Sequence, residues 1–202
     1  GLQRIAYITS RHGHNGLFRH SLHGEILAFL RRRKRSVRMP ELFVGLATLG
    51  PVGKKLPAPG TFGSLVGLCV FGCLVLIAKM SPLLVSLLFI PLFLFGIPLC
   101  SKAEEILGKS DPGEVIWDEF TAIPFVFLLI PQEINSQNEL KSFGWLFAGF
   151  LVFRFFDILK PFGIKRLQSI SGGMGVMIDD LVAALFASIT LFAAKTFPLS
   201  FF

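Results

Sequence analysis

Five acidic residues that border apolar stretches are the first candidates for chemistry in this chain of 202 residues. They are Asp118, Glu119, Asp157, Asp179 and Asp180. A carboxylate at the edge of a membrane is costly to keep charged, so such a residue is by default a candidate for a functional site. We therefore predict that the five form a catalytic group. The alternative is that they are charges solvated in loops.

The available side chains limit the metal that this group could hold. All four histidines lie near the N-terminus, at positions 12, 14, 20 and 23, so the apolar part of the chain has no imidazole. Carboxylate oxygens suit Mg²⁺, which binds a few carboxylates and keeps water and substrate phosphate as its other ligands. The residues therefore predict a Mg²⁺ site, and its predicted ligands are Asp118, Glu119, Asp179 and Asp180.

Two cations flank one of the acids. Arg154 precedes Asp157 by three residues and Lys160 follows it by three. On a helix this spacing places the three side chains on one face. The arrangement is either a structural ion pair or a pair of phosphate-binding cations beside a metal ligand.

A glycine-containing segment, 59–64, leads directly into the first apolar stretch. The free N–H groups and the dipole at the start of a helix attract anions, so this segment is suited to phosphate. A second glycine-rich segment, 171–175, leads to Asp179 in the same way, and either segment could also be a simple connector. The predicted phosphate-binding residues are Gly60, Thr61, Ser64, Arg154 and Lys160.

The elements that must position these residues are strongly apolar. Hydrophobic residues make up 52% of the chain and charged residues 16%, and the mean hydropathy is +0.67. A soluble domain carries roughly a quarter charged residues. Five apolar stretches, some near the roughly 20 residues that a membrane-spanning helix needs, cover 62–78, 82–100, 120–131, 143–156 and 181–194. We predict an all-α polytopic integral membrane protein with about five membrane-embedded helices.

The charge distribution predicts the topology. Residues 1–60 hold eleven Lys and Arg against two acids, whereas the net charge of the whole chain is +7. Basic flanks of the first span stay in the cytoplasm, so the N-terminus is predicted to be cytoplasmic. We predict that the short stretch 120–131 crosses the membrane like the other four, because otherwise the cations of 154–180 would lie outside. With five crossings, the five acids and the 59–64 segment lie on the cytoplasmic face.

We divide the chain into a basic N-terminal extension, residues 1–40, and a membrane-embedded domain, residues 41–202. The extension contains the basic run 31–35, for which nucleic acid is the usual partner. Here no soluble basic domain surrounds the run, and a long apolar element follows it. We therefore predict contact with anionic lipid heads and no nucleic-acid partner.

Four motifs carry a resemblance to a known family. Their sequences are PGTFGS (59–64), VIWDEF (115–120), FRFFDILKP (153–161) and GGMGVMIDDLVA (172–183). In this order, over about residues 43–195, they resemble phosphatidylglycerophosphatase A. One departure is Gln168, which stands where that family often has Asp and removes one possible metal ligand.

The resemblance implies a magnesium-dependent enzyme of the bacterial cytoplasmic (inner) membrane. Its substrate would be phosphatidylglycerol phosphate, from which it would release phosphate and phosphatidylglycerol in phospholipid metabolism, both biosynthesis and degradation. Two other functions are alternatives. A transferase of the CDP-alcohol type requires an Asp-containing spacing that is missing here, and a small transporter or ion channel would place charges in the middle of its spans. The sequence is compatible both with direct attack by water and with a phospho-aspartate intermediate. It does not give the oligomeric state.

Overall fold

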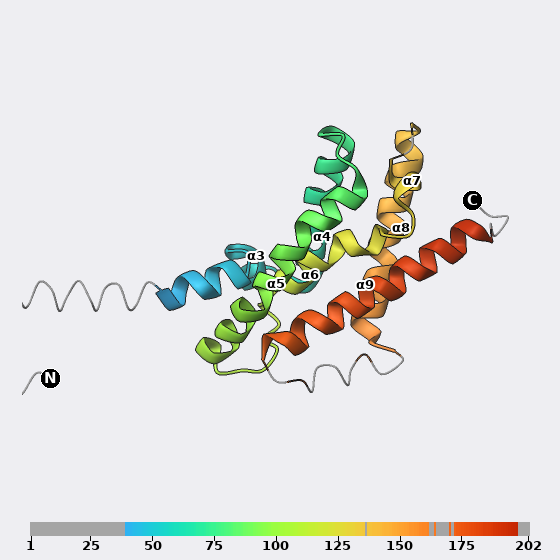
Figure 1. Cartoon of the computed structure of the whole chain (residues 1–202). Coiled ribbons are helices and arrows are strands. Elements are labelled where there is room, and N and C mark those ends of the chain that lie inside the picture. Colours follow the sequence, from blue (N-terminus) through green and yellow to red (C-terminus); the bar gives the residue numbers. More distant parts are fainter. Residues whose placement is uncertain (1–38, 136, 162–163, 165–169, 171, 198–202) are drawn as a thin grey trace, which may run out of the picture. The chain divides into compact units, whose positions relative to one another are not determined.

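The computed structural model describes residues 39–197, apart from 136, 162–163, 165–169 and 171. The predicted extension, 1–40, therefore lies almost wholly outside the described residues. The described part is helical and contains no strand. After a helical segment at 39–47, its elements are α3 (Pro51–Lys55), α4 (Pro59–Gly72), the π-helix η1 (Cys73–Ile77), α5 (Pro82–Leu107), α6 (Trp117–Ala122), the 3₁₀-helix η2 (Ile123–Phe127), α7 (Pro131–Ile134), α8 (Glu139–Leu159) and α9 (Gly173–Thr196) (Figure 1).

Four of these helices are long and apolar enough to cross a membrane, within the described ranges: Pro59–Ile77, Pro82–Leu107, Glu139–Leu159 and Gly173–Thr196. The prediction of an all-α polytopic membrane protein is confirmed. Proline starts both of the first two helices, where its missing N–H costs nothing. The third is capped at its start by Asn138, whose side-chain oxygen accepts a hydrogen bond from the Lys141 amide at 3.2 Å.

The remaining apolar stretch, 120–131, is not one long helix but the pair α6 and η2. Every residue of η2 is buried. Neighbouring serines satisfy part of the backbone of this broken segment, since Ser86 Oγ donates to the Pro124 carbonyl at 3.0 Å and Ser188 Oγ accepts from the Leu129 amide at 3.2 Å. Non-helical backbone at membrane depth is tolerated only where protein surrounds it in this way.

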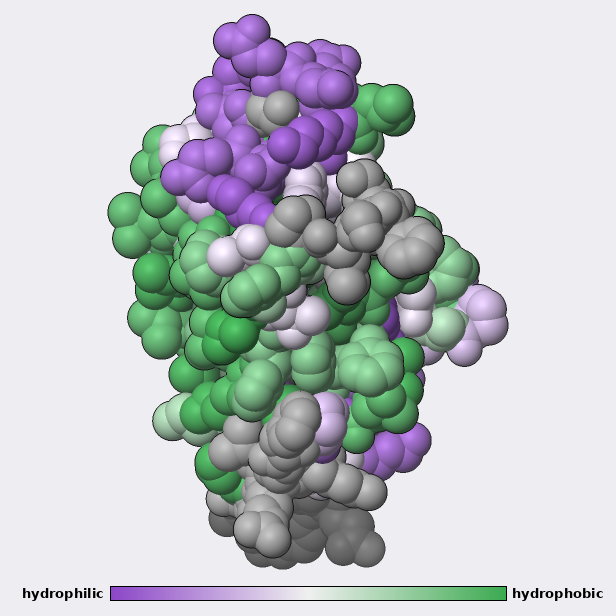
Figure 2. All heavy atoms as spheres, turned by 90° about the vertical axis from the view of Figure 1, so that its right-hand side faces the viewer, coloured by the Kyte–Doolittle hydropathy of each residue, from purple (hydrophilic) through white to green (hydrophobic). Residues whose placement is uncertain are grey.

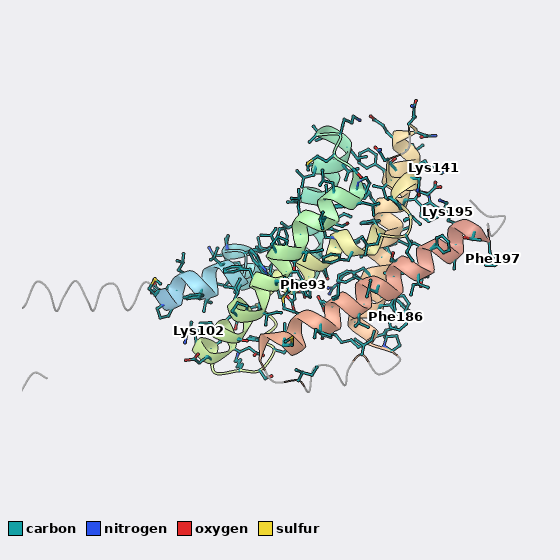
Figure 3. All side chains as sticks on the ribbon, in the orientation of Figure 1. Phe93, Lys102, Lys141, Phe186, Lys195 and Phe197 are labelled. Atoms are coloured by element: carbon teal, nitrogen blue, oxygen red, sulfur yellow. The ribbon has the colours of Figure 1, made fainter. Side chains whose placement is uncertain are left out.

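This short segment runs from one end of the bundle to the other. At its start, Glu119 lies 3.9 Å from Arg154, near the last turn of α8. After it, Glu133 lies 2.7 Å from Lys141 in the first turn of α8 and 3.2 Å from Lys195 in the last turn of α9. Figure 3 places Lys141 and Lys195 together at one end of the bundle. Within residues 39–197 the described chain therefore passes through the bundle five times, four times as a long helix and once as a short broken segment.

The surface agrees with a membrane environment. Large hydrophobic side chains are exposed along all four long helices, for example Leu87 on α5, Phe147 on α8 and Ile189 on α9. Figure 2 shows hydrophobic residues over much of one face, with hydrophilic residues gathered at the upper end, where α7 and the start of α8 lie. Water would be a poor solvent for so much apolar surface.

Close packing of α4 against α6 positions the site. Gly60, Gly63 and Gly67 follow one face of α4, and a β-carbon at each would stand within 3.0 Å of an atom of residues 116–120. Small residues let helices approach this closely in membranes. On the other side of α6, the indole N–H of Trp117 donates to the Leu92 carbonyl of α5 at 3.1 Å. The start of α6 is thereby fixed between α4 and α5.

Candidate active site

Four helix ends bring the predicted acids and cations together. They are the first turn of α4, the start of α6, the last turn of α8 and the second turn of α9. Although as many as 120 positions separate Gly60 from Asp180, contacts link all four ends. Four of the five acids, Asp118, Asp157, Asp179 and Asp180, are buried, and Glu119 is partly buried.

One group of acids has the geometry of a metal site. Asp118, Glu119 and Asp180 each offer an oxygen, and these three atoms lie within 4.8 Å of one another. Each of the three also has a buried oxygen without a hydrogen-bond partner in the described part of the protein: Asp118 Oδ1, Glu119 Oε2 and Asp180 Oδ2. Buried carboxylate oxygens ordinarily have partners, so three neighbouring carboxylates that each carry an unpartnered oxygen fit a hard divalent cation such as Mg²⁺.

Lys160 lies beside this group. Its Nζ forms an ion pair with Asp179 and lies 3.6 Å from Asp157 Oδ1 and 3.8 Å from Asp180 Oδ1. Burial by itself would lower the pKa of Lys160, but the carboxylates of Asp180 and Asp179 outweigh it and hold the pKa above its ordinary value. The ammonium therefore stays charged.

The backbone of Lys160 is unusual in a way that serves this position. It ends α8 in the left-handed conformation, with φ 42°, which costs a residue other than glycine or asparagine free energy. This conformation at Lys160 ends α8 directly after the helical turn that carries Asp157. The Lys160 side chain is thus brought to the α9 acids.

Arg154 connects α8 to both α4 and α6. Its Nη1 forms an ion pair with Asp157, donates to Ser64 Oγ at 3.2 Å and lies 3.9 Å from Glu119 Oε1. Its Nε is buried and has no acceptor among the described residues. A buried guanidinium donor without an acceptor, beside unpartnered carboxylate oxygens, is suited to an oxygen of a bound anion.

The first turn of α4 faces the same point. A β-carbon on Gly60 would stand 2.2 Å from Glu119 Oε1 and 3.3 Å from Arg154 Nη1. Ser64 Oγ donates to the Gly60 carbonyl at 2.9 Å while accepting from Arg154. Thr61 is half-buried in the same turn of α4.

Charge balance supports a bound cation. Five carboxylates and two cations give the site a formal charge of −3 when all of them are ionised. An uncompensated buried charge is costly, and a buried site normally gains counter-charges. A metal ion would supply them at the three unpartnered oxygens. A phosphate alone would add to the negative charge.

The ten predicted site residues differ in their surroundings. Asp118, Glu119 and Asp180 form the group with metal-site geometry, whereas Asp179, also predicted as a ligand, lies outside it and pairs with Lys160. Asp157 lies between the two cations, as the three-residue spacing suggested. Of the second glycine-rich segment, 172–175 are described and begin α9, while 171 lies outside the described residues. Gln168 lies outside them as well.

Sequence reasoning missed Ser101. Its hydroxyl oxygen accepts a hydrogen bond from the Gly173 amide at 2.7 Å, so a side chain of α5 caps the start of α9. Residue Gly172, at the N-cap position, has no side chain to do so. A β-carbon on Gly173 would stand 2.2 Å from the Ile97 carbonyl oxygen. This close contact with α5 fixes the position of the start of α9, and thereby that of Asp179 and Asp180. In the sequence, the one local sign of it is that no residue with a capping side chain precedes α9.

Comparisons with known proteins point to one family. The family model described as phosphatidylglycerophosphatase A matches residues 45–195. A phosphatidylglycerophosphatase A of Haemophilus influenzae is 40% identical over 141 residues, which are 69% of this chain and 80% of that protein. The Escherichia coli phosphatidylglycerophosphatase A is 32% identical over 143 residues, 70% of this chain and 77% of its own.

A third relative carries a different name. A Bacteroides thetaiotaomicron protein, provisionally named a phosphatidylinositol-3-phosphatase, is 32% identical over 140 residues, 68% of this chain and 84% of its own. All three names describe phosphatases of lipid phosphate monoesters. No solved structure matches this chain.

Proposed function

Because this chain belongs to the phosphatidylglycerophosphatase A family, we propose that it hydrolyses phosphatidylglycerol phosphate to phosphatidylglycerol and phosphate. One observation carries the proposal: the unpartnered oxygens of Asp118, Glu119 and Asp180 lie in the same site as the unpartnered Nε of Arg154. A metal and a phosphate monoester would satisfy these four atoms together.

We assign the metal position to Asp118, Glu119 and Asp180, with Mg²⁺ as the ion. Oxygen ligands and the lack of histidine in residues 24–202 favour Mg²⁺ over a transition metal. A bound Mg²⁺ would polarise the phosphoryl group and offset the charge of its oxygens. Asp179 and Asp157 hold Lys160 in place from either side.

The substrate phosphate is assigned to Arg154, Lys160 and the first turn of α4. Phosphoryl transfer requires mainly positioning and neutralisation of charge, which two cations and the positive end of a helix dipole supply. Gly60 leaves the room that brings this helix end against Glu119. Ser64 holds Arg154 toward α4 through its hydroxyl.

The overall reaction is a hydrolysis. The bond between phosphorus and the ester oxygen breaks, a water oxygen joins phosphorus, and the leaving ester oxygen receives a proton. The site carboxylates are the groups placed to accept the proton of the attacking water. In the alternative route a carboxylate attacks phosphorus and expels the ester oxygen, and water then hydrolyses the phospho-aspartate, so that one water oxygen enters phosphate in either route.

We place the site at the cytoplasmic face of the bacterial inner membrane, with a role in phospholipid biosynthesis. The basic residues of the N-terminal part support this orientation. Arg154 and Lys160 lie at one end of the bundle, and Lys141 and Lys195 lie at the other. Reporter fusions at Asn138 and Lys109 test it, with Asn138 expected outside and Lys109 inside.

Phosphate release by purified protein in detergent tests the function. We expect release from phosphatidylglycerol phosphate in Mg²⁺, none after chelation, and recovery when Mg²⁺ is returned. Phosphatidylinositol 3-phosphate is the comparison substrate, because one relative carries that name. Faster release from this lipid would move the substrate assignment to it. Undiminished release in chelator would contradict the metal assignment.

A further inference from the structure

A pocket of about 370 Å³ lies away from the acids, between α4 with η1 on one side and the first turns of α8 on the other. Apolar residues of both elements line it, among them Leu68, Gly72, Leu76, Phe143 and Phe147. At Gly72 an added β-carbon would meet only Leu146 Cδ1, at 3.8 Å. The missing side chain therefore leaves part of this space open.

The pocket continues the helix faces that carry the phosphate-binding residues. Spacings of three and four residues keep side chains on one face of a helix. Such a series on α4 contains Thr61, Leu65, Leu68 and Gly72, and the series on α8 contains Arg154, Phe150, Phe147 and Phe143. Between the site and the pocket, both series are apolar. Leu65 is exposed and Phe150 is half-buried, so neither surface is closed off by other parts of the described structure.

The distances along the two helices agree with each other. At a rise of 1.5 Å per residue, Gly72 lies about 12 Å from Ser64 along α4, and Phe147 lies about 10 Å from Arg154 along α8. Ser64 and Arg154 themselves are in contact, at 3.2 Å. One acyl chain of a phospholipid covers half of the hydrocarbon core, roughly 15 Å. A chain that starts beside Arg154 and Ser64 therefore reaches the pocket.

We propose that this pocket holds an acyl chain of the lipid whose phosphate lies against Arg154 and Lys160. The inference rests on the proposed function and deepens it, because it places the substrate between α4 and α8. An acyl chain is the occupant that suits the position, since the lining is apolar and the path begins at a phosphate-binding end. A consequence is that long-chain lipids gain binding from the pocket that short-chain lipids cannot.

The first test fills the pocket. Gly72→Leu adds a side chain into the open space, whereas Gly144→Leu, on α8 with nothing within 4 Å of an added β-carbon, is the matched control. For a substrate with sixteen-carbon chains we expect Gly72→Leu to lower kcat/KM by roughly tenfold or more, the scale of a lost hydrophobic contact in a pocket. For a six-carbon substrate we expect a change under about twofold. Equal effects on the two substrates, or none, would overturn the proposal.

The second test does not depend on turnover. Two native cysteines, Cys69 and Cys73, are exposed and line the pocket, while Cys100 is buried. A phosphomonoester lipid with a diazirine at the middle of its acyl chain is bound to the full-length protein in nanodiscs and photolysed. We expect adducts on the peptide that contains Cys69 and Cys73, and competition by unlabelled long-chain lipid.

The outcomes separate this inference from the proposed function. If the protein releases no phosphate from either lipid but the adducts fall on this peptide, the function fails and the pocket assignment stands. If phosphate is released and the adducts spread along the exposed faces of α5 and α9, the lipid is only a surrounding one and the pocket assignment fails. Disulfide-linked dimers through Cys69 or Cys73 would show that a second copy of the chain occupies the pocket. This result would also overturn the pocket assignment.

Discussion

Gly60 and Glu119 lie so close that no methyl group fits between them: a β-carbon on Gly60 would stand 2.2 Å from Glu119 Oε1. The first turn of α4 and the acid of α6 therefore share one space. This relationship gives Gly60 a role beyond its backbone N–H. It keeps room for the carboxylate that we assign to the metal.

We expect Gly60→Ala to move the Glu119 carboxylate and to lower kcat/KM by roughly a hundredfold, the scale of a 1 Å displacement of a catalytic group. Thermal unfolding should change little, because alanine suits a helix better than glycine. Gly45→Ala is the control, since an added β-carbon there meets nothing within 4 Å. Equal activities of the two variants would remove Gly60 from the site.

Substitutions of the adjacent residues Asp179 and Asp180 should have different effects in a magnesium titration. Asp180→Asn removes an oxygen of the metal group, so we expect the Mg²⁺ concentration for half-maximal activity to rise by roughly a hundredfold. Asp179→Asn removes the partner of Lys160 and should raise that concentration less. Isothermal titration with Mg²⁺ alone checks the same difference without turnover. A larger effect from Asp179→Asn would reverse the assignment.

Replacing Lys160 tests whether it acts on phosphate. Lys160→Ala should lower kcat/KM by roughly a hundredfold, as when an electrostatic stabiliser of the transition state is removed. Lys102→Ala is the matched control, because Lys102 forms an exposed ion pair with Glu105. Steady-state kinetics on a short-chain lipid phosphate measures both. Near-normal turnover by Lys160→Ala would leave Lys160 as a structural partner of Asp157 and Asp179.

Glu133 predicts how stability depends on pH at the other end of the bundle. A hydrogen bond from Lys141 is the main cause that lowers the pKa of Glu133, and Lys195 adds to it. Because the pKa is lower in the folded state, this stabilisation is present at neutral pH and is lost as the pH falls through the folded-state pKa. We expect Glu133→Gln to cost less than about 1 kcal/mol at pH 7.

Thermal unfolding at a series of pH values measures this effect. The difference between wild type and Glu133→Gln should shrink steadily as the pH falls below 4.5, the ordinary pKa of the group. Glu139→Gln, at the exposed start of α8, serves as the control. A difference that stays constant from pH 7 to pH 3 would show that the ion pairs of Glu133 contribute nothing.

The sequence by itself determined the class of the protein and its family. Composition sufficed for a helical membrane protein, because an apolar helix in lipid satisfies its own backbone hydrogen bonds wherever its neighbours lie. Spacing sufficed for the link between Arg154 and Asp157, since residues three positions apart on one helix are neighbours in any fold. The four ordered motifs were enough to indicate the family.

Only the tertiary structure decided which acids lie together with the geometry of a metal site. Asp179 and Asp180 point about 100° apart on α9, and the packing of α9 against α5 and α8 turns one toward Lys160 and the other toward Asp118. The same packing replaced a predicted fifth membrane-embedded helix by the broken segment α6 and η2, and two backbone groups in or just after this segment find serine partners on other helices. Contacts of this kind join residues far apart in the chain, and no local pattern of residue types encodes them.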